Sequence, residues 1–211
     1  SDLRFRSVIG DFTWTGWDYI GEAGVGIVSY EAGEGGFGAR FPAQLAYCGD
    51  FDLLGRRRPM SFLREIVFGL REKPYIAVQN PRHFGEPMEK TPWVLSDCER
   101  SYSYADCVGK RAIVEVFSAG DSAELFVDGV SQGKKTAGEA ADYRVLGEIT
   151  LTGGTLRAVS YRSGEVIGED TLCSAGEAAK IAVTAGGGEK TGELVFVNID
   201  LCDAAGNLAA D

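Results

Sequence analysis

Three side chains in one short stretch have the types and the spacing to do chemistry: Trp14, Asp18 and Glu22. An indole presents a flat apolar surface on which the apolar face of a ligand can stack. Two carboxylates can act as acid/base and nucleophile when rigid elements hold them on both sides of a substrate. Asp18 and Glu22 would share one face of a helix, but Gly16 and Gly21 favour an irregular loop. We therefore expect a binding surface here rather than a self-contained catalytic pair.

Other roles for these residues stay open. Trp14 would also suit an apolar core, and Trp17 is expected to pack under the loop. Asp18 would accept hydrogen bonds from a ligand's hydroxyls or orient a neighbouring base, and a carboxylate that caps the loop is the alternative. Glu22 carries the same alternatives. Asp50 and Asp52 are expected to cap a turn, because two carboxylates without further ligands are weak evidence for a cation site.

The composition excludes several classes of function. The formal net charge is −10, from 21 basic and 31 acidic residues, so we expect no nucleic-acid partner. A single histidine, His83, argues against Ser-His-Asp chemistry and against a zinc site with several histidines. No run approaches the roughly eighteen apolar residues of a membrane span, so no membrane partner is expected.

The cysteines indicate neither a metal centre nor a redox motif. No two of them form a C-x-x-C pair, so we predict no metal and no cofactor. An odd, scattered set is typical of buried free thiols and favours a reducing compartment, such as the cytoplasm. The five are Cys48, Cys98, Cys107, Cys173 and Cys202.

The segment that must position Trp14 is predicted to contain one strand and one helix. Residues 8–14 are interpreted as a short strand, and a glycine-rich loop follows. A helix is expected over residues 59–71, with Pro59 at its start and an apolar stripe at helical spacing. The stripe residues are Leu63, Ile66, Val67 and Leu70. One strand and one helix cannot close a core, so the stripe is expected to be buried on the following β region, on residues 1–20 or on another copy of the chain. Residues 56–58 are three arginines and are interpreted as a solvated basic turn.

The middle of the chain has the alternation of β structure. Strands are predicted at residues 112–117 and 124–127, followed by Asp128-Gly129, which favours a type I′ hairpin turn. A second hairpin is predicted from residues 155–161 and 165–172. Short strands at this spacing are typical of an immunoglobulin-like sandwich. Trp93 is interpreted as a core anchor of this sandwich, with an exposed binding platform as the alternative.

Four segments resemble family 2 glycoside hydrolases, the β-galactosidase group. The run FTWTGWDYIGE (12–22) resembles the eighth barrel strand and its loop, and YCGDFDLLG (47–55) resembles the next motif. The run ELFVDG (124–129), with GKK (133–135), and the run GTLRAVSY (154–161) are similar to the sandwich domain behind the barrel. Together these segments extend the resemblance over nearly the whole chain.

The resemblance implies a mainly β fold: an immunoglobulin-like antiparallel β-sandwich, preceded by the last strand, loop and helix of a (β/α)8 barrel. Residues 1–73 would be the barrel remnant, 74–172 the sandwich, and 173–211 the truncated start of a further sandwich domain. Active sites of such barrels lie at the C-terminal ends of the strands. The segment from Trp14 to Glu22 would lie at that end.

The resemblance also implies part of a retaining glycoside hydrolase that acts on a β-linked oligosaccharide or glycoside. Its catalytic glutamates would lie on the fourth and seventh barrel strands, upstream of Ser1, so no catalytic residue is assigned here and the chain alone is expected to be inactive. Trp14, Asp18 and Glu22 would bind the carbohydrate substrate. The alternative is a non-catalytic carbohydrate-binding or spacer module, which should show a row of exposed aromatic side chains.

Overall fold

The computed structural model describes residues 5, 7–10, 12–33, 41–186, 192 and 194–209. The chain forms two compact units. The first comprises residues 1–65 and 85–98, and the second comprises residues 66–84 and 99–211. Residues 34–38 of the predicted glycine-rich loop lie outside the described residues.

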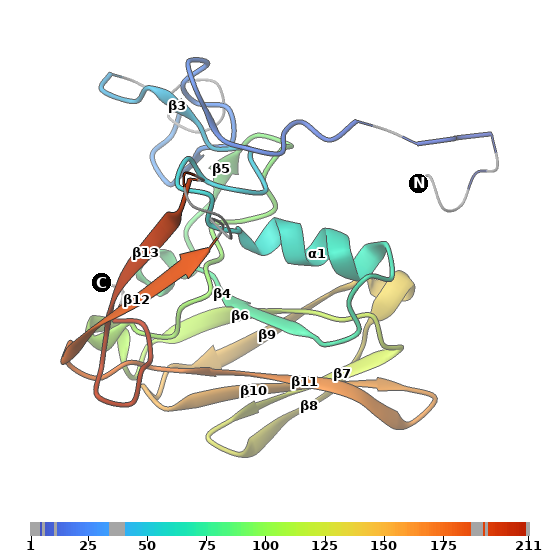
Figure 1. Cartoon of the computed structure of the whole chain (residues 1–211). Coiled ribbons are helices and arrows are strands. Elements are labelled where there is room, and N and C mark those ends of the chain that lie inside the picture. Colours follow the sequence, from blue (N-terminus) through green and yellow to red (C-terminus); the bar gives the residue numbers. More distant parts are fainter. Residues whose placement is uncertain are drawn as a thin grey trace. The chain divides into compact units, whose positions relative to one another are not determined.

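The second unit is built on two antiparallel sheets (Figure 1). The first sheet has the order β4-β6-β9, with β4 at Tyr75–Val78, β6 at Arg111–Phe117 and β9 at Arg144–Thr150. The second has the order β11-β10-β7-β8, with β7 at Ser122–Val127, β8 at Val130–Thr136, β10 at Thr155–Arg162 and β11 at Glu165–Cys173. Short 3-10 turns lie at Pro81–His83, Ala105–Cys107 and Gly138–Ala141. The predicted mainly β sandwich is confirmed.

The two hairpins form where turn residues interrupt the alternation. Asp128 and Gly129 have φ angles of 48° and 81°, the two positive values that a type I′ turn requires. Ser163 and Gly164, at 53° and 88°, join β10 to β11 in the same way. The predicted turns are therefore confirmed, and each joins two strands that pair antiparallel.

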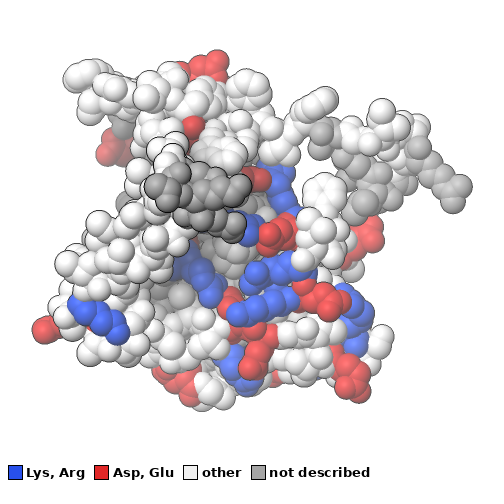
Figure 2. All heavy atoms as spheres, viewed as in Figure 1, with Lys and Arg blue, Asp and Glu red and all other residues white. Residues whose placement is uncertain are grey.

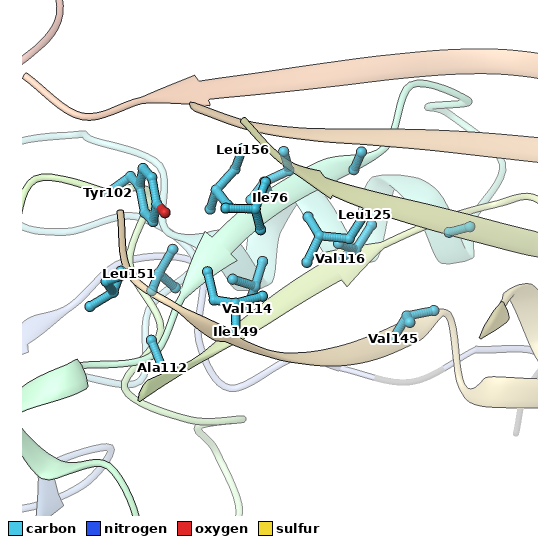
Figure 3. Packing of buried hydrophobic residues seen from close by; sticks show 14 of the residues in the cluster. Ile76, Tyr102, Ala112, Val114, Val116, Leu125, Val145, Ile149, Leu151 and Leu156 are labelled. Carbon is cyan, nitrogen blue, oxygen red and sulfur yellow. The ribbon is translucent and has the colours of Figure 1, made fainter. Parts of the chain in front are cut away.

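Both sheets contribute to one hydrophobic core (Figure 3). Ile76 and Val114 enter it from the first sheet, and Leu125 and Leu156 from the second. Along β7, buried and half-buried residues alternate, as the two-residue period of a strand requires. Burying each such aliphatic side chain contributes about 1.5–3 kcal/mol.

The first unit has little regular structure. Strand β1 (Tyr19–Ile20) pairs with β3 (Leu45–Ala46), and β2 (Val28–Ser29) pairs with β5 (Glu89–Lys90). Helix α1 covers Pro59–Val67, and its residues up to Glu65 belong to this unit. The predicted strand at 8–14 is wrong for the described residues of that segment, which are not paired in a sheet. A strand needs neighbours for its backbone hydrogen bonds, and Ile9 and Phe12 are fully exposed.

The helix is shorter than the apolar stripe predicted. It ends at Val67 because Gly69 adopts a φ of 70° and donates its N–H to the carbonyl of Ile66 at 3.1 Å. Leu63 and Ile66 are buried, whereas Leu70 lies beyond the helix and is 78% exposed. The expectation that the whole stripe is buried is therefore wrong for Leu70.

A separate two-stranded hairpin follows the sandwich in the sequence. Strand β12 (Lys180–Gly186) pairs antiparallel with β13 (Phe196–Cys202). Ile181 lies opposite Leu201 and Val183 opposite Ile199, so these four side chains share one face. All four are exposed. This hairpin therefore presents an apolar surface that the described residues leave open.

Charged side chains of both signs are interspersed on the face shown in Figure 2. Exposed pairs in the second unit include Arg162 with Glu72 at 2.8 Å and Arg157 with Glu169 at 3.0 Å. Such surface pairs contribute about 0–1 kcal/mol each. No helix among the described residues is long and apolar enough to cross a membrane.

Candidate functional site

The first unit contains an open cavity of about 600 Å³. Its lining residues are Trp14, Glu22, Ala23, Val25 and Trp93. Small-molecule pockets typically measure about 300–1,000 Å³ and combine apolar walls with a few polar groups. Two indoles, two aliphatic side chains and one carboxylate match that description. Two of the three predicted site residues therefore meet at one cavity.

A tyrosine connects the indole to the carboxylate. Trp14 donates its Nε1–H to the hydroxyl of Tyr19 at 3.1 Å, and that hydroxyl donates to Oε2 of Glu22. The rings of Trp14 and Tyr19 meet edge to face, with centroids 6.0 Å apart. The hydrogen bond to Glu22 raises the pKa of Tyr19 above its usual value, so the phenol stays a donor at neutral pH. The phenol thus orients both groups at the cavity.

Glycines shape the loop that carries Glu22. Glu22 itself has a φ of 41°, and its carbonyl accepts the N–H of Val25 at 3.2 Å. Gly26 has a φ of 82°, and a Cβ there would lie 2.5 Å from the carbonyl carbon of Tyr47. Only glycine permits that close approach. The loop is therefore tight enough to hold Glu22 and Val25 on the same cavity.

The second sequence motif packs directly against the first. Asp50 donates its N–H to the carbonyl of Thr15 at 3.1 Å, and Asp18 donates its N–H to the carbonyl of Phe51 at 2.9 Å. The peptide bond between Trp14 and Thr15 is cis. At Gly49 a Cβ would lie 2.2 Å from the backbone nitrogen of Asp18. These contacts position the segment that begins at Trp14.

Asp18 is a buried carboxylate that joins these segments. The residue is 4% exposed, and its side chain accepts the N–H of Gly49 at 2.9 Å and a guanidinium N–H of Arg58 at 2.5 Å. Burial raises the pKa of Asp18, and the bonds from Gly49 and Arg58 oppose that rise. Arg58 also donates to the carbonyl of Tyr47 at 2.7 Å. Asp18 is not among the cavity's lining residues. The structure thus gives it the loop-holding role, and direct contact with a substrate stays a prediction.

The arginine run is not simply solvated. Arg58 pairs with Asp18, and Arg57 pairs with Glu65 at 2.9 Å while its guanidinium lies 4.0 Å from the ring centroid of Phe62. The interpretation as a solvated basic turn is therefore wrong for Arg58, whereas Arg57 stays exposed although it forms an ion pair. Both side chains reach carboxylates that become neighbours only in the folded unit.

Other predictions concern residues near this site. Oδ1 of Asp52 accepts the N–H groups of Leu54 and Arg56 at 2.8 Å, which confirms the turn-capping role. Asp50 instead pairs with Arg64 at 2.7 Å. Among the described residues, no three His, Cys, Asp or Glu side chains are placed to hold a metal ion.

The surroundings of two tryptophans, Trp17 and Trp93, differ from those predicted from the sequence. Trp17 stacks on Phe51, with centroids 4.7 Å apart, and is 56% exposed, so only one of its faces is packed. The prediction that Trp93 is a core anchor of the sandwich is wrong, because Trp93 lies in the first unit and lines the cavity. No local pattern marks this placement, because the pairing of β2 with β5 that brings it there joins distant parts of the chain.

Comparison with known proteins finds similarity to carbohydrate-active enzymes. It is 28% identical over 207 residues to a β-galactosidase of Bacteroides ovatus, covering 97% of this chain and 20% of that protein. It is 27% identical over 173 residues to a protein of Formosa agariphila named as a β-glucuronidase, covering 14% of that protein. The resemblance to family 2 glycoside hydrolases is confirmed. The chain spans about a fifth of the length of these relatives or less.

Solved structures support the same relationship. A family 2 glycosyl hydrolase from Bacteroides cellulosilyticus matches 95% of this chain with a TM-score of 0.79 and 34% identity, over 26% of its own length. A β-glycosidase from Bacteroides vulgatus matches 99% of the chain with a TM-score of 0.67 at 20% identity, which shows the shared fold. Residues 109–168 match a family described as a domain of unknown function, DUF4982.

Proposed function

We propose that the chain is part of a retaining glycoside hydrolase that acts on a β-linked oligosaccharide or glycoside. In this proposal residues 1–73 are the end of a (β/α)8 barrel, 74–172 an immunoglobulin-like module except for residues 85–98, which cluster with the first unit, and 173–211 the start of another. The observation that carries the proposal is the cavity on which Trp14 and Glu22 meet, joined through Tyr19. The matches to glycoside hydrolases support it.

The cavity supplies the two contacts that a pyranose needs. The exposed face of Trp14, 56% accessible, can stack on the C–H face of the ring. The carboxylate of Glu22 can accept hydrogen bonds from ring hydroxyls, and charge-assisted hydrogen bonds are the stronger kind. Asp18 acts as a positioning residue, since its bonds to Gly49 and Arg58 hold the segment after Trp14.

The charge of the cavity favours a neutral sugar. Glu22 is acidic, and the other lining residues described are uncharged. A uronate carboxylate bound against Glu22 would place two like charges together, which costs about 4 kcal/mol at 4 Å in a medium of effective dielectric constant 20. A galactoside-like hexose brings hydroxyl donors instead. The cavity thus suits a neutral glycoside better than a glucuronide.

Hydrolysis of the glycosidic bond requires catalytic carboxylates that these residues do not supply. Retaining hydrolysis uses an acid/base and a nucleophile whose carboxyl groups lie about 5–5.5 Å apart. Among the described residues that line the cavity, Glu22 alone carries a carboxylate. By resemblance, the catalytic glutamates belong to other barrel strands. The role of this chain is therefore to bind and orient the sugar.

Fluorine NMR of the chain labelled with fluorotryptophan tests this binding role. Methyl β-galactoside should shift the Trp14 resonance, and Glu22→Gln should weaken its binding. Methyl β-glucuronide should bind less well, and Glu22→Gln should reduce the difference. Trp17→Phe is the matched control, since Trp17 is equally exposed and lies outside the cavity lining. Unchanged tryptophan resonances with every glycoside would contradict the proposal.

The alternative of a non-catalytic binding module has less support. It needs an exposed row of aromatic side chains on the sandwich, and the sequence offers Trp93, Tyr102 and Tyr104 as candidates. Tyr102 is 1% exposed and belongs to the core, and Trp93 belongs to the first unit. Glycoside-induced shifts confined to backbone signals of residues 99–173 would favour this alternative.

A further inference from the structure

We propose that Trp93 forms a second subsite of the cavity, which binds the leaving group of a β-glycoside through an apolar or aromatic face. The inference rests on the proposed function, in which Trp14 holds the cleaved sugar. Trp93 lines the same cavity and is 36% exposed. A sugar ring stacked on one indole leaves the second indole for the group attached to that ring.

The size and chemistry of the cavity fit two groups. At about 600 Å³ it lies in the range of pockets that take drug-sized ligands, which are much larger than a hexose. Glu22 supplies polar contacts beside Trp14, whereas Val25 and Ala23 are the remaining apolar lining. A ligand with one hydroxylated ring and one flat apolar group would use every lining residue.

The turn that carries Trp93 is closed and anchored. Thr91 accepts the N–H of Val94 at 3.3 Å through its carbonyl, which closes a turn around Trp93. The Thr91 hydroxyl, in a buried side chain, accepts the N–H of Gly26 at 2.9 Å. Lys90 donates to the carbonyl of Val94 at 3.0 Å. Because Gly26 follows Val25 directly, the anchor connects the Trp93 turn to the cavity's own loop.

Contacts on both sides of the turn hold the rest of the segment. Before it, Glu89 accepts the N–H of Gly33 at 2.9 Å, and β5 pairs with β2. After it, Asp97 accepts the hydroxyl proton of Tyr30 at 2.5 Å. Burial, with the bond to Asp97, raises the pKa of Tyr30, so this donor persists across the physiological range. An aromatic surface held in place in this way loses little conformational entropy when it binds a ligand.

The labelled chain allows a direct test with two glycosides that differ only in the leaving group. Nitrophenyl β-galactoside should bind more tightly than methyl β-galactoside and should shift the Trp93 resonance, which the methyl glycoside should not. Trp93→Ala should reduce the ratio of the two affinities by roughly 2- to 10-fold, the range expected for one aromatic contact. Trp17→Ala is the control and should leave the ratio unchanged, because Trp17 does not line the cavity.

A second variant tests the positioning of Trp93. Thr91→Val removes the hydroxyl that binds Gly26 and keeps the size of the side chain. It should reduce the ratio of the nitrophenyl to the methyl galactoside affinity, although the Trp93 indole is still present. If Trp93→Ala leaves the ratio of the two affinities unchanged, for example by weakening both glycosides equally, while the Trp14 resonance still shifts with ligand, the inference is overturned. If Trp14 itself responds to neither glycoside, the proposed function fails as well, so the two failures are distinguishable.

Discussion

Gly49 lies where two backbone segments of the first unit touch. Its Cα faces the backbone nitrogen of Asp18 and the carbonyl oxygen of Phe51, and a Cβ would come within 2.2 Å and 2.5 Å of these atoms. Backbone atoms held by hydrogen bonds cannot move aside as a flexible side chain can. The position of the segment around Trp14 therefore depends on the absence of a side chain at Gly49.

We expect Gly49→Ala to lower the free energy of unfolding of the first unit by about 1–3 kcal/mol or more, because overpacking forces the backbone to shift. Urea unfolding followed by tryptophan fluorescence measures this change. Gly16→Ala is the matched control, since nothing lies within 4 Å of a Cβ at that exposed position. Equal stability of the two variants would contradict the expectation.

Asp170 links stability to pH in the second unit. Burial raises its pKa, but bonds from Arg100 at 2.6 Å and 3.0 Å, the N–H of Ile76 and the charge of Lys73 together hold that pKa below its usual value. A lowered folded-state pKa means that the stabilisation is present above the unfolded value, near pH 4, and is lost as the pH falls below it.

Asp170→Asn should therefore cost roughly 1.5–3 kcal/mol at neutral pH, as expected for hydrogen bonds to a charged group. In this variant the free energy of unfolding should also decrease less as the pH falls below about 4. Urea titrations at neutral and acid pH measure both effects, with Asp142→Asn as the exposed-carboxylate control. A variant as steeply acid-sensitive as the parent chain would argue against this role of Asp170.

At the scale of elements, the β12–β13 hairpin leaves one of its faces exposed. Its exposed face carries Ile181, Val183, Ile199 and Leu201, and apolar faces of this kind bind dyes and favour association. The double variant Val183→Lys and Ile199→Lys should reduce the fluorescence of a bound hydrophobic dye severalfold. Thr184→Lys is the control, because Thr184 lies on the opposite face beside Asn198. An equal reduction in both variants would show that the dye binds elsewhere.

For the whole molecule, we expect no hydrolysis of nitrophenyl glycosides by the chain alone. Binding at Trp14 and Glu22 does not provide the two opposed carboxylates that retaining chemistry requires. A colorimetric assay with nitrophenyl β-galactoside and β-glucuronide measures this directly. Turnover that disappears in Asp18→Asn would contradict the prediction and would identify a local carboxylate pair.

Local sequence patterns determined the sandwich and much of the site. Hairpins such as the one at Asp128-Gly129 depend on alternation and on residues that tolerate positive φ, and both are properties of a few neighbouring residues. The site at Trp14 and Glu22 could be predicted for the same reason, because these residues lie within one loop. The strand expected at residues 8–14 failed since a strand also depends on neighbours to pair with.

Tertiary structure alone decided which distant groups meet. Trp93 reaches the cavity because β5 pairs with β2 and Thr91 binds Gly26, contacts between segments far apart in the chain. Asp18 became a buried partner of Arg58 in the same way. Local periodicity determines which face of a segment is apolar. The choice of partner for that face depends on the packing of the whole unit, which no single stretch of sequence contains.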